Sequence, residues 1–515
     1  MVKDLDVLNK TENPPFLPDD LGNLPRDEVR LKYRYIDLRR PRMQHILGIR
    51  HKVMKTTRDY FSENGFLEVE TPILYKSTPE GPREFLVPSR NVPGNWYALP
   101  QSPQLFKQIL MVAGCDRYMQ ICRCFRDEDP RADRQAEFSQ IDLEMSFVQR
   151  DDVMAMMEGY VRRLWGEVAG VTVPPLRRMN YREAMEKYGI DRPDLRYGLE
   201  VQDISDLAAK TDFGVFKTAL DKGATLPQFN SKKGVVKALR VPGGAEKLTR
   251  KMTDGYGEKA KGFGAGGVPV VKVNAQGVFE TGIAKFLEPI KAEVIARLGL
   301  KPGDTVLFTS DVYSIATKLM GEMRQWVAKD MGLIPAWGKE WNFLWVIDFP
   351  MFERNKETGK WVAMHHPFTA PREDQQQAFV NARVDDDSTV EAIVSAGYDI
   401  VLNGSEIAGG SVRIHNREVQ SKVFSPLGLT PEQAQQKFSF LLEALQFGAP
   451  PHGGVAFGLD RLIMHLCGTD DIKDVIAFPK TQIGSDLLTG APSAATDDQL
   501  KDVYVKSTWS PPPPA

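Results

Sequence analysis

Two apolar runs separated by a densely charged loop constrain the fold of this chain more than any other feature. Residues 117–125 read RYMQICRCF and residues 136–147 read AEFSQIDLEMSF. Both runs have strand character, and two strands joined by a polar loop predict a long antiparallel hairpin. Other strand-like segments follow without regular strand–helix–strand alternation. The sequence therefore predicts an α+β fold in which an antiparallel sheet is flanked by helices.

A long helix and a change of composition divide the chain into regions. The helix is expected from about Pro41 to Asn64, because apolar residues recur on one face and Gly65 can end it. Between residues 194 and 333, glycines and lysines crowd together with few aromatics, which indicates an inserted domain. We expect a remnant strand and hinge over 1–30, a main domain in two parts over 31–193 and 334–500, the insert over 194–333, and a disordered tail over 501–515.

The composition leaves nucleic-acid binding open and argues against secretion. A net charge of −2 is uninformative, because opposite charges can lie on different faces. Four cysteines are too few for a disulfide framework, so reduced thiols are expected, with a structural role for Cys122 and Cys124. No signal-peptide pattern opens the chain and no apolar run is long enough to span a bilayer, so the sequence predicts a cytoplasmic protein.

One glycine pattern is misleading. Gly262, Gly264 and Gly267 have the spacing of a dinucleotide-binding loop, which needs a strand before it and a helix after it. Here a helical stretch precedes and a strand-like run follows, so we expect a turn. The chain also has no G-x-x-x-x-G-K-[ST] loop, so any ATP would be held in another way.

The charged loop carries the strongest chemical signal. Arg126 and Glu128 are two positions apart, on either side of Asp127, and are expected on one face of the hairpin. A guanidinium offers a planar fork of donors that suits phosphate, and a carboxylate can accept from an exocyclic amine of a base. A solvated charge ladder is the alternative. The flanking Phe138 and Ile141 favour the binding site over that alternative.

Two weaker signals lie toward the ends of the chain. Residues 458–461 (GLDR) stand between a strand-like run and an amphipathic helix, so Arg461 is expected at a helix N-terminus, where anions are favoured. Alone, an arginine at such a place is commonly a cap or a surface ion pair. Residues 66–72 (FLEVETP) follow the long helix, and read alone they indicate an edge strand ended by proline.

Taken in order, these three segments resemble motifs 1, 2 and 3 of the class II aminoacyl-tRNA synthetases. Four more segments are similar to bacterial aspartyl-tRNA synthetases: residues 77–83 (STPEGPR), 101–107 (QSPQLFK), 365–369 (HHPFT) and 409–413 (GGSVR). The similarity runs from about Leu31 to near Pro492. Residues 194–333 resemble the α+β GAD domain of bacterial members.

The resemblance implies an ATP site. The arginine that clamps the α-phosphate corresponds to Arg126, and the acid that reads adenine corresponds to Glu128. Phe138 and Arg461 correspond to the two groups that sandwich the base. The remaining implied contacts with ATP are Asp127, Gln135, Glu406, Gly458, Leu459 and Asp460.

The resemblance also implies a site for L-aspartate. Lys107 and Arg413 correspond to two cations that face its side-chain carboxylate. A neutral asparagine would leave a desolvated cation unpaired, at a cost of roughly 2–5 kcal/mol, so the site should discriminate against it. The other implied contacts with aspartate are Glu80, Ser102, Gln104, Arg126, Asp142, His365 and His366.

The implied reaction has two steps. L-Aspartate and ATP form aspartyl-adenylate and pyrophosphate, and aspartate then passes to the 3′-end of tRNA(Asp) with release of AMP. Asp399 and Glu406 correspond to the carboxylates that hold Mg²⁺, an ion that prefers oxygen ligands, and they join Arg126 and Arg461 as the implied catalytic residues. The loop at 129–134 is expected to touch the tRNA acceptor end, and motif 1 around Pro72 to form a homodimer interface.

The sequence departs from the family pattern at several positions. The family begins with an OB-fold that grips the anticodon, and here most of that domain is expected to be missing. Ala408 stands where glycine is usual, and Pro82 and Glu84 replace alanine and aspartate. Three alternatives stay open: an adenylate-forming paralogue with a non-tRNA acceptor, an asparaginyl-tRNA synthetase, and a non-enzymatic nucleic-acid-binding module.

Overall fold

The chain consists of two compact units. The computed structural model describes residues 4–20, 22–78, 83–128, 132–222, 233–355, 357–384 and 386–508. The first unit comprises residues 1–144, 159–172 and 456–515, and the second comprises residues 145–158 and 173–455. The strand β5 (Glu137–Ser146), the helix α5 (Arg150–Ala169) and the strand β17 (His452–Gly458) each cross from one unit to the other along the chain.

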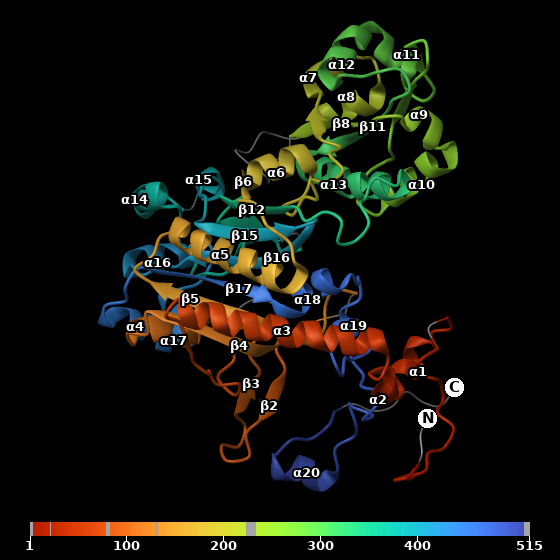
Figure 1. Ribbon diagram of the computed structural model, residues 1–515. Helices are drawn as coiled ribbons and strands as arrows, with labels where there is room; N and C mark the ends of the chain where they lie inside the picture. The colour runs from red at the N-terminus through yellow and green to blue at the C-terminus, as the bar shows by residue number, and fades with distance from the viewer. Residues whose placement is uncertain are drawn as a thin grey trace. The chain divides into compact units, whose positions relative to one another are not determined.

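The first unit is built around β4, β5 and the long helix α3 (Figure 1). Besides β5 and part of α5, its elements are α1 (Asp27–Lys32), α2 (Arg34–Asp37), α3 (Pro41–Glu63), β1 (Leu67–Glu68), β2 (Leu86–Pro88), β3 (Trp96–Ala98), α4 (Gln104–Val112), β4 (Arg117–Phe125), α18 (Leu459–Cys467), α19 (Ile472–Val475) and α20 (Asp497–Asp502). β1 pairs in parallel with β4, and β4 lies beside β5. The two predicted runs are therefore neighbouring strands.

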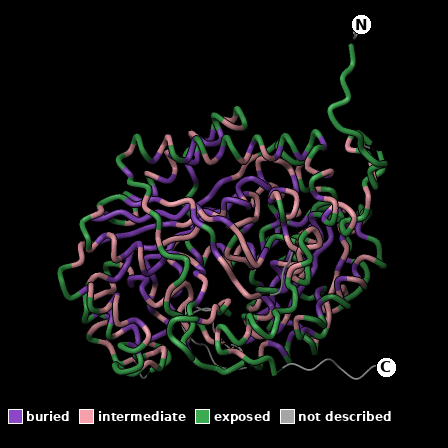
Figure 2. The backbone as a smooth tube through the Cα atoms, turned by 90° about the horizontal axis from the view of Figure 1, so that it is seen from below, coloured by how far each residue is buried: buried purple, intermediate pink, exposed green. Residues whose placement is uncertain are grey.

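The helix α3 confirms the prediction over residues 41–64. Pro41 occupies its first turn, where no backbone N–H is needed, and Gly65 turns the chain after it with a φ of 78°. Ile46 and Val53 face the interior. The helix packs against α18 and α19. Residues 4–15, by contrast, are exposed throughout (Figure 2).

The second unit contains two larger sheets, and the first of them is mixed. The strand order is β17-β16-β15-β12-β6, with β6 parallel to β12 and the pairs β12–β15 and β15–β16 antiparallel. Its elements are β6 (Arg177–Asn180), α6 (Tyr181–Tyr188), β12 (Phe343–Ile347), β13 (Phe352–Arg354), β14 (Trp361–Ala363), α14 (Glu373–Asn381), α15 (Asp387–Glu391), β15 (Gly397–Leu402), β16 (Ser405–Val412), α16 (Arg417–Phe424), α17 (Pro431–Ala444) and the 3₁₀ helix η2 (Leu445–Phe447). The helix α6 packs its Tyr181 and Tyr188 on Leu344 and Val401.

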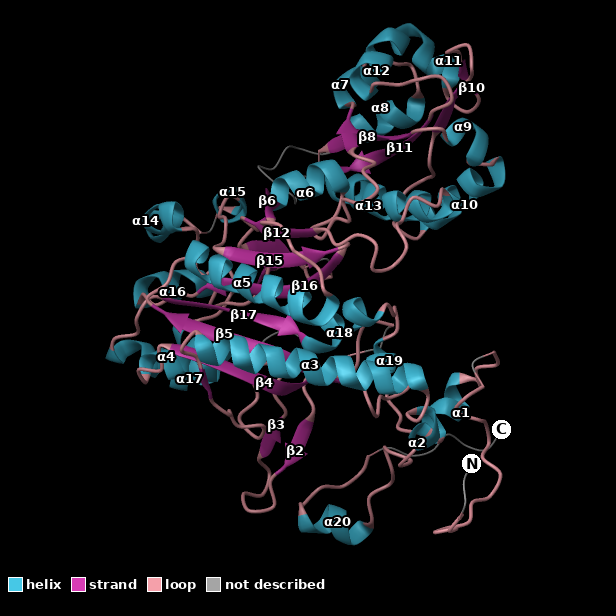
Figure 3. Cartoon of the chain, viewed as in Figure 1, coloured by secondary structure: helices cyan, strands magenta, loops and turns pink. Residues whose placement is uncertain are grey.

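A second sheet of the same unit has the order β10-β9-β11-β8-β7. Its elements are β7 (Val201–Asp203), α7 (Ser205–Ala208), α8 (Gly214–Leu220), β8 (Gly234–Val241), α9 (Gly244–Lys247), α10 (Arg250–Lys261), β9 (Val270–Val273), β10 (Phe279–Glu280), α11 (Ala284–Leu287), η1 (Glu288–Ile290), α12 (Lys291–Leu298), β11 (Thr305–Val312) and α13 (Tyr313–Asp330). All of these elements fall inside the predicted insert. Figure 3 shows its helices on both faces of the sheet.

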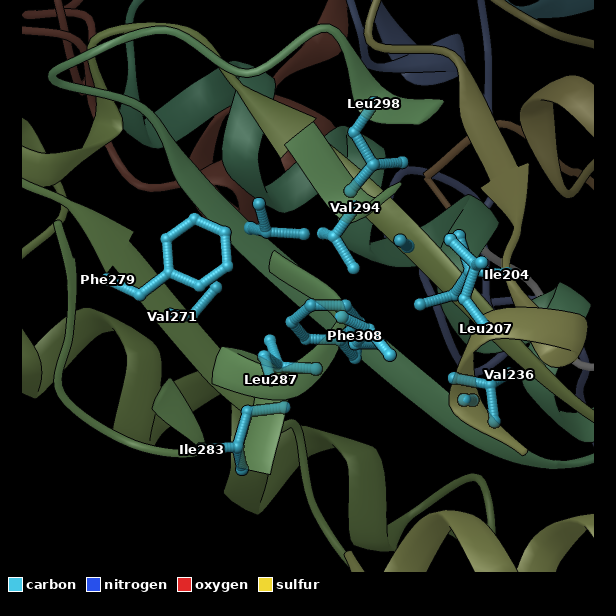
Figure 4. Packing of buried hydrophobic residues seen from close by; sticks show 14 of the residues in the cluster. Ile204, Leu207, Val236, Val271, Phe279, Ile283, Leu287, Val294, Leu298 and Phe308 are labelled. Carbon is cyan, nitrogen blue, oxygen red and sulfur yellow. The ribbon is translucent and has the colours of Figure 1, made fainter. Parts of the chain in front are cut away.

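Each face of this second sheet carries its own apolar core. Side chains alternate along a strand, so Val236 and Phe308 pack with α7, α8, α11 and α12 on one face (Figure 4), while Leu239 and Leu307 pack with α10 and α13 on the other. The sheet of the predicted insert is therefore covered by packed apolar side chains on both faces.

The misleading glycines form a turn, as predicted. The helix α10 ends at Lys261, residues 262–267 follow, and β9 begins at Val270, so the order is helix then strand. Within the described ranges, no helix combines the length and apolar character needed to cross a membrane.

Candidate active site

The guanidinium of Arg126 lies at the end of β4 and stacks on an aromatic ring. Its Cζ is 5.0 Å from the ring centroid of Phe138, which comes from the neighbouring β5. The backbone N–H of Arg126 donates to the carbonyl of Ala136 at 2.9 Å, which fixes the residue in the hairpin. The buried Nε has no hydrogen-bond partner among the described residues. Because a buried donor without an acceptor is costly, this group is suited to receive an anion.

The carboxylate predicted to read adenine is half-buried beside the same hairpin. Glu128 accepts from Arg134 at 3.3 Å. Arg461 lies in the first turn of α18, as predicted, and its Nη2 is 3.4 Å from Asp133 of the loop. The loop residues 129–131 lie outside the described part of the chain.

Two further predicted ATP contacts already bind other parts of the first unit. The side-chain amide of Gln135 donates to the carbonyl of Lys480 at 3.2 Å and accepts from its N–H at 2.9 Å. The buried Asp460 accepts from Arg50 of α3 at 2.6 Å and from the backbone N–H of Ser139 at 2.8 Å. These contacts give Gln135 and Asp460 a positioning role, because they hold the 480 loop and α18 against the hairpin.

The remaining predicted ATP contacts lie close to these residues along the chain. Gly458 is the N-cap of α18, Leu459 is fully buried, and the backbone N–H of Asp127 donates to the carbonyl of Arg83 at 2.9 Å.

Lys107 is the centre of a buried charge cluster in the first unit. Its Nζ lies 2.7 Å from Asp142 and 3.4 Å from Glu144, and all three side chains are at most 2% exposed. Asp142 thus holds the cation that the sequence assigned to the substrate's side chain. Burial, with the nearby charge of Asp142, raises the pKa of Tyr118 far above its ordinary range, so that ring stays neutral.

Two polar side chains, Ser102 and Gln104, lie at the start of α4, and Ser102 holds the first turn of the helix. Ser102 accepts from the backbone N–H of Gln104 at 3.0 Å. The buried Nε2 of Gln104 has no partner among the described residues, so it can still donate to a ligand. Glu80, the last predicted contact with aspartate in this unit, lies outside those residues.

In the second unit, two carboxylates converge over a glycine. Asp399 of β15 is paired in register with Gly409 of β16, and Glu406 lies on the same strand as Gly409. A Cβ on Gly409 would stand 2.9 Å from Asp399 Oδ1 and 3.3 Å from Glu406 Oε1. Asp399 is only 9% exposed, and its Oδ1 has no hydrogen-bond partner among the described residues. Two oxygen ligands of this kind fit Mg²⁺, which takes its other ligands from water and phosphate.

The two adjacent histidines point to different partners. His365 Nε2 is 3.8 Å from Asp399 Oδ1, and burial lowers the pKa of His365 to about 4, so the ring is neutral at pH 7. His366 Nε2 lies 2.7 Å from Arg413 Nη1. Arg413 is buried and also donates to Ser411 at 2.6 Å. The two histidines therefore contact different residues: His365 lies near Asp399, and His366 orients Arg413.

Sequence reasoning missed Asp191. This carboxylate follows α6, and burial, with the charge of Glu406 as a second cause, raises its pKa. Nothing in its local sequence marks it, because the partners that identify it lie on β15 and β16. In the part of the chain that the structure describes, no three His, Cys, Asp or Glu side chains are grouped closely enough to hold a metal by themselves.

Comparison with known families gives one match over most of the chain. The family of class II tRNA synthetases (D, K and N) matches residues 26–482.

Individual relatives cover almost the whole chain. The aspartate–tRNA(Asp/Asn) ligase of Symbiobacterium thermophilum is 50% identical over 509 residues, which are 98% of this chain and 83% of the relative. The enzyme of the same name from Hydrogenobaculum sp. is 49% identical, over 99% of this chain and 84% of its own length. The aspartate–tRNA ligase of Clostridium perfringens is 47% identical, over 98% and 81%.

Proposed function

The chain belongs to the class II tRNA synthetases of the D, K and N group, and from this we propose that it is an aspartate–tRNA ligase. It activates L-aspartate with ATP and transfers the aspartyl group to tRNA. The observation that carries the proposal is the guanidinium of Arg126, stacked on Phe138 with a buried Nε that meets no acceptor in the described residues. A phosphate would satisfy this donor with charge-assisted bonds.

The first step needs charge neutralisation more than a side-chain base. The α-carboxylate of aspartate attacks the α-phosphorus of ATP, the P–O bond to pyrophosphate breaks, and pyrophosphate leaves. Arg126 would stabilise the negative charge that grows on the α-phosphoryl oxygens. Mg²⁺, when bound by Asp399 and Glu406, would supply a second positive charge at the phosphates.

The second step uses the same activated acyl group. The terminal adenosine hydroxyl of the tRNA attacks the carbonyl of the mixed anhydride, the bond to AMP breaks, and the hydroxyl proton leaves with the released AMP or solvent. Positioning of the two substrates supplies most of the rate. The loop at 129–134 is proposed to contact the acceptor end of the tRNA.

Recognition of aspartate is proposed to rest on two prepared cations. Arg413 is buried and oriented by His366 and Ser411, and Lys107 is held by Asp142. A guanidinium fixed in this way binds a carboxylate with little loss of conformational freedom. We assign Gln104 and Ser102 to the polar surroundings of the amino acid, because Nε2 of Gln104 is buried and unsatisfied among the described residues.

We further propose that the protein works in the cytoplasm as a homodimer that associates through motif 1. Around β1 the first unit exposes Leu67, Ile73 and Leu74, by 61%, 48% and 51%. Neighbouring exposed apolar side chains of this size are suited to a protein interface. The GAD-like insert is proposed as a separate module of residues 194–333.

Aspartate-dependent exchange of pyrophosphate into ATP tests the first step. We expect exchange with L-aspartate and at least a hundredfold less with asparagine, glutamate or lysine. Exchange that is independent of aspartate, or better with asparagine, would refute the assignment.

Charging of purified tRNA tests the second step. The name of one relative includes both tRNA(Asp) and tRNA(Asn), whereas the name of another specifies neither. For this reason tRNA(Asp) and tRNA(Asn) should be assayed in parallel. Adenylate formation without transfer to either tRNA would instead indicate another acceptor.

A further inference from the structure

Residues 472–480 of the first unit hold the loop between β4 and β5 at two positions. The backbone N–H of Ile472, the first residue of α19, donates to the carbonyl of Ala132 at 2.9 Å. At the other end of the segment, Lys480 exchanges two hydrogen bonds with the side-chain amide of Gln135. The half of the loop that leads into β5 is therefore held by a single segment.

Arg34 of α2 holds the middle of this segment. Its side chain is almost fully buried, at 2% exposure. Its Nε donates to the carbonyl of Ala477 at 2.8 Å, and its Nη2 donates to the carbonyls of Lys473 and Ile476, each at 2.9 Å. Carbonyls at the end of a helix lack partners within it, so Arg34 fixes the direction in which the chain leaves α19.

The guanidinium of Arg34 is itself oriented by α1 and α2. The fully buried Asp37 accepts from Arg34 Nη1 at 2.6 Å, and it also accepts from Nε and Nη2 of Arg30, at 3.0 and 3.2 Å. A guanidinium is planar and its donors have fixed directions, so one orientation satisfies the carboxylate and the three carbonyls together. Direct hydrogen bonds therefore connect α1 and α2 to the loop through a single arginine.

The start of the same loop is fixed in a different way. The N–H of Arg126 donates to the carbonyl of Ala136 within the hairpin, without help from residues 472–480. Loss of Arg34 should therefore displace the far half of the loop more than the guanidinium proposed to contact ATP. A displacement of roughly 1 Å caused by a change far from the reacting atoms can slow a step by about 10²-fold.

We propose that Arg34 is a positioning residue for the transfer of the aspartyl group to tRNA, and that it acts by holding the loop through residues 472–480. The inference rests on the proposed function, in which this loop contacts the acceptor end of the tRNA. It assigns a role to a residue that lies outside the three motifs and makes no contact with the reacting atoms. Its consequence is that the transfer step depends on Arg34 more strongly than the formation of aspartyl-adenylate does.

Arg34→Lys in the full chain tests the proposal by comparing the two steps. Lysine keeps a positive charge beside Asp37 but lacks the fork of donors that reaches three carbonyls. In rapid-quench experiments, transfer from the preformed enzyme-bound aspartyl-adenylate to tRNA(Asp) should slow by about 10- to 100-fold, with pyrophosphate exchange within about threefold of the wild type. A purely structural role would slow both steps alike.

Arg40→Lys is the matched control, because Arg40 is a second buried arginine of the first unit that donates to a backbone carbonyl. It is 4% exposed, and its Nη2 donates to the carbonyl of Asp20 at 2.6 Å. Among the described residues it makes no hydrogen bond with residues 472–480, so the ratio of transfer to exchange should stay at the wild-type value. The same ratio in Arg34→Lys as in Arg40→Lys would overturn the proposal.

Ile472→Pro provides a second test if Arg34→Lys fails to fold. It removes the N–H that donates to Ala132, at the first position of a helix, where proline is tolerated. The preceding Asp471 is extended, with φ −111° and ψ 116°, as a residue before proline requires. Transfer should be slower than in Ile472→Val, which keeps the N–H, by about fivefold, the effect of one hydrogen bond. Equal transfer rates in the two variants would refute the role of the segment.

Hydrogen exchange measured by mass spectrometry separates this proposal from the proposed function. In Arg34→Lys, exchange should accelerate in residues 132–137 and 472–480, whereas α4 should keep its protection. A wild-type protein that forms aspartyl-adenylate but charges no tRNA would refute the transfer step of the proposed function. Unchanged exchange in residues 132–137 of Arg34→Lys would instead refute the role of Arg34, whatever the acceptor is.

Discussion

At the scale of single residues, the role proposed for Arg126 in the first unit depends on what its guanidinium contacts. It stacks on Phe138 and leaves a buried donor unsatisfied among the described residues. Arg126→Ala should lower kcat of pyrophosphate exchange by about 10²–10³-fold, the usual effect of removing one transition-state donor. Arg126→Lys should recover only part of the activity, because lysine lacks the planar fork. Arg123→Ala, on the same strand and 41% exposed, is the control and should stay within about twofold of the wild type.

The buried cluster around Lys107 permits a stability prediction at the same scale. Lys107→Met leaves Asp142 and Glu144 buried without their cation. The free energy of unfolding, measured by urea denaturation, should fall by about 3–5 kcal/mol, as expected when one partner of a buried ion pair is removed. Adding Asp142→Asn should restore part of this loss, because it removes one uncompensated charge. If the double variant is less stable than Lys107→Met, the cluster is not held by charge pairing.

Residue types indicate what chemistry a side chain can do, but they do not predict which partners it contacts. The sequence marked His365 and His366 together, but the fold turns one to Asp399 and the other to Arg413. It assigned Gln135 to ATP, and the structure places its amide on the backbone of Lys480. Such partners come from tertiary packing, which a local motif does not contain.

At the scale of elements, the contact between α6 and α13 allows a sharp test of helix packing. Alanine in a helix is normally more stable than glycine by about 0.8–1.0 kcal/mol. In Gly321→Ala, however, the new Cβ would stand 2.5 Å from the carbonyl oxygen of Gly189. The variant should therefore lower the melting temperature in calorimetry. Gly257→Ala in α10, where a Cβ meets nothing within 4 Å, should raise it. A stabilising effect of Gly321→Ala would show that the two backbones are not in contact.

Long elements were predictable because they repeat one pattern many times. The helix α3 repeats buried residues at helical spacing, and the strands β4 and β5 are long runs rich in apolar residues, so all three could be identified from sequence. The strand β1 has only two residues, Leu67 and Glu68, and its parallel pairing with β4 depends on a partner more than fifty positions away in the printed sequence. Strand order in the second unit likewise depends on pairing between segments that are distant in the sequence, so local periodicity could not predict it.

At the scale of the whole molecule, the side chain of Arg324 ties together the two ends of the predicted insert. Arg324 of α13 is fully buried and donates to the carbonyls of Asp194, Gly198 and Leu199, at 3.1, 2.6 and 2.8 Å. Its guanidinium also lies 4.7 Å from the ring of Tyr188 on α6. The segment 194–199, where the chain enters the insert, is thus held by one cation from the segment where the chain leaves it.

Arg324→Met should therefore loosen the junction while both insert cores persist. Each carbonyl left without a donor costs about 1–3 kcal/mol when it stays buried, so the free energy of unfolding should fall by at least about 3 kcal/mol. Hydrogen exchange measured by mass spectrometry should speed up in residues 194–199, while β8 and β11, which pair over eight residue positions, keep their protection. Arg297→Met, which breaks an ion pair whose arginine is 41% exposed, should cost no more than about 1 kcal/mol. Equal acceleration of exchange across the whole insert would mean that Arg324 supports the fold of the insert itself. The contact between α6 and α13 would then be the remaining explanation for how residues 194–199 are held.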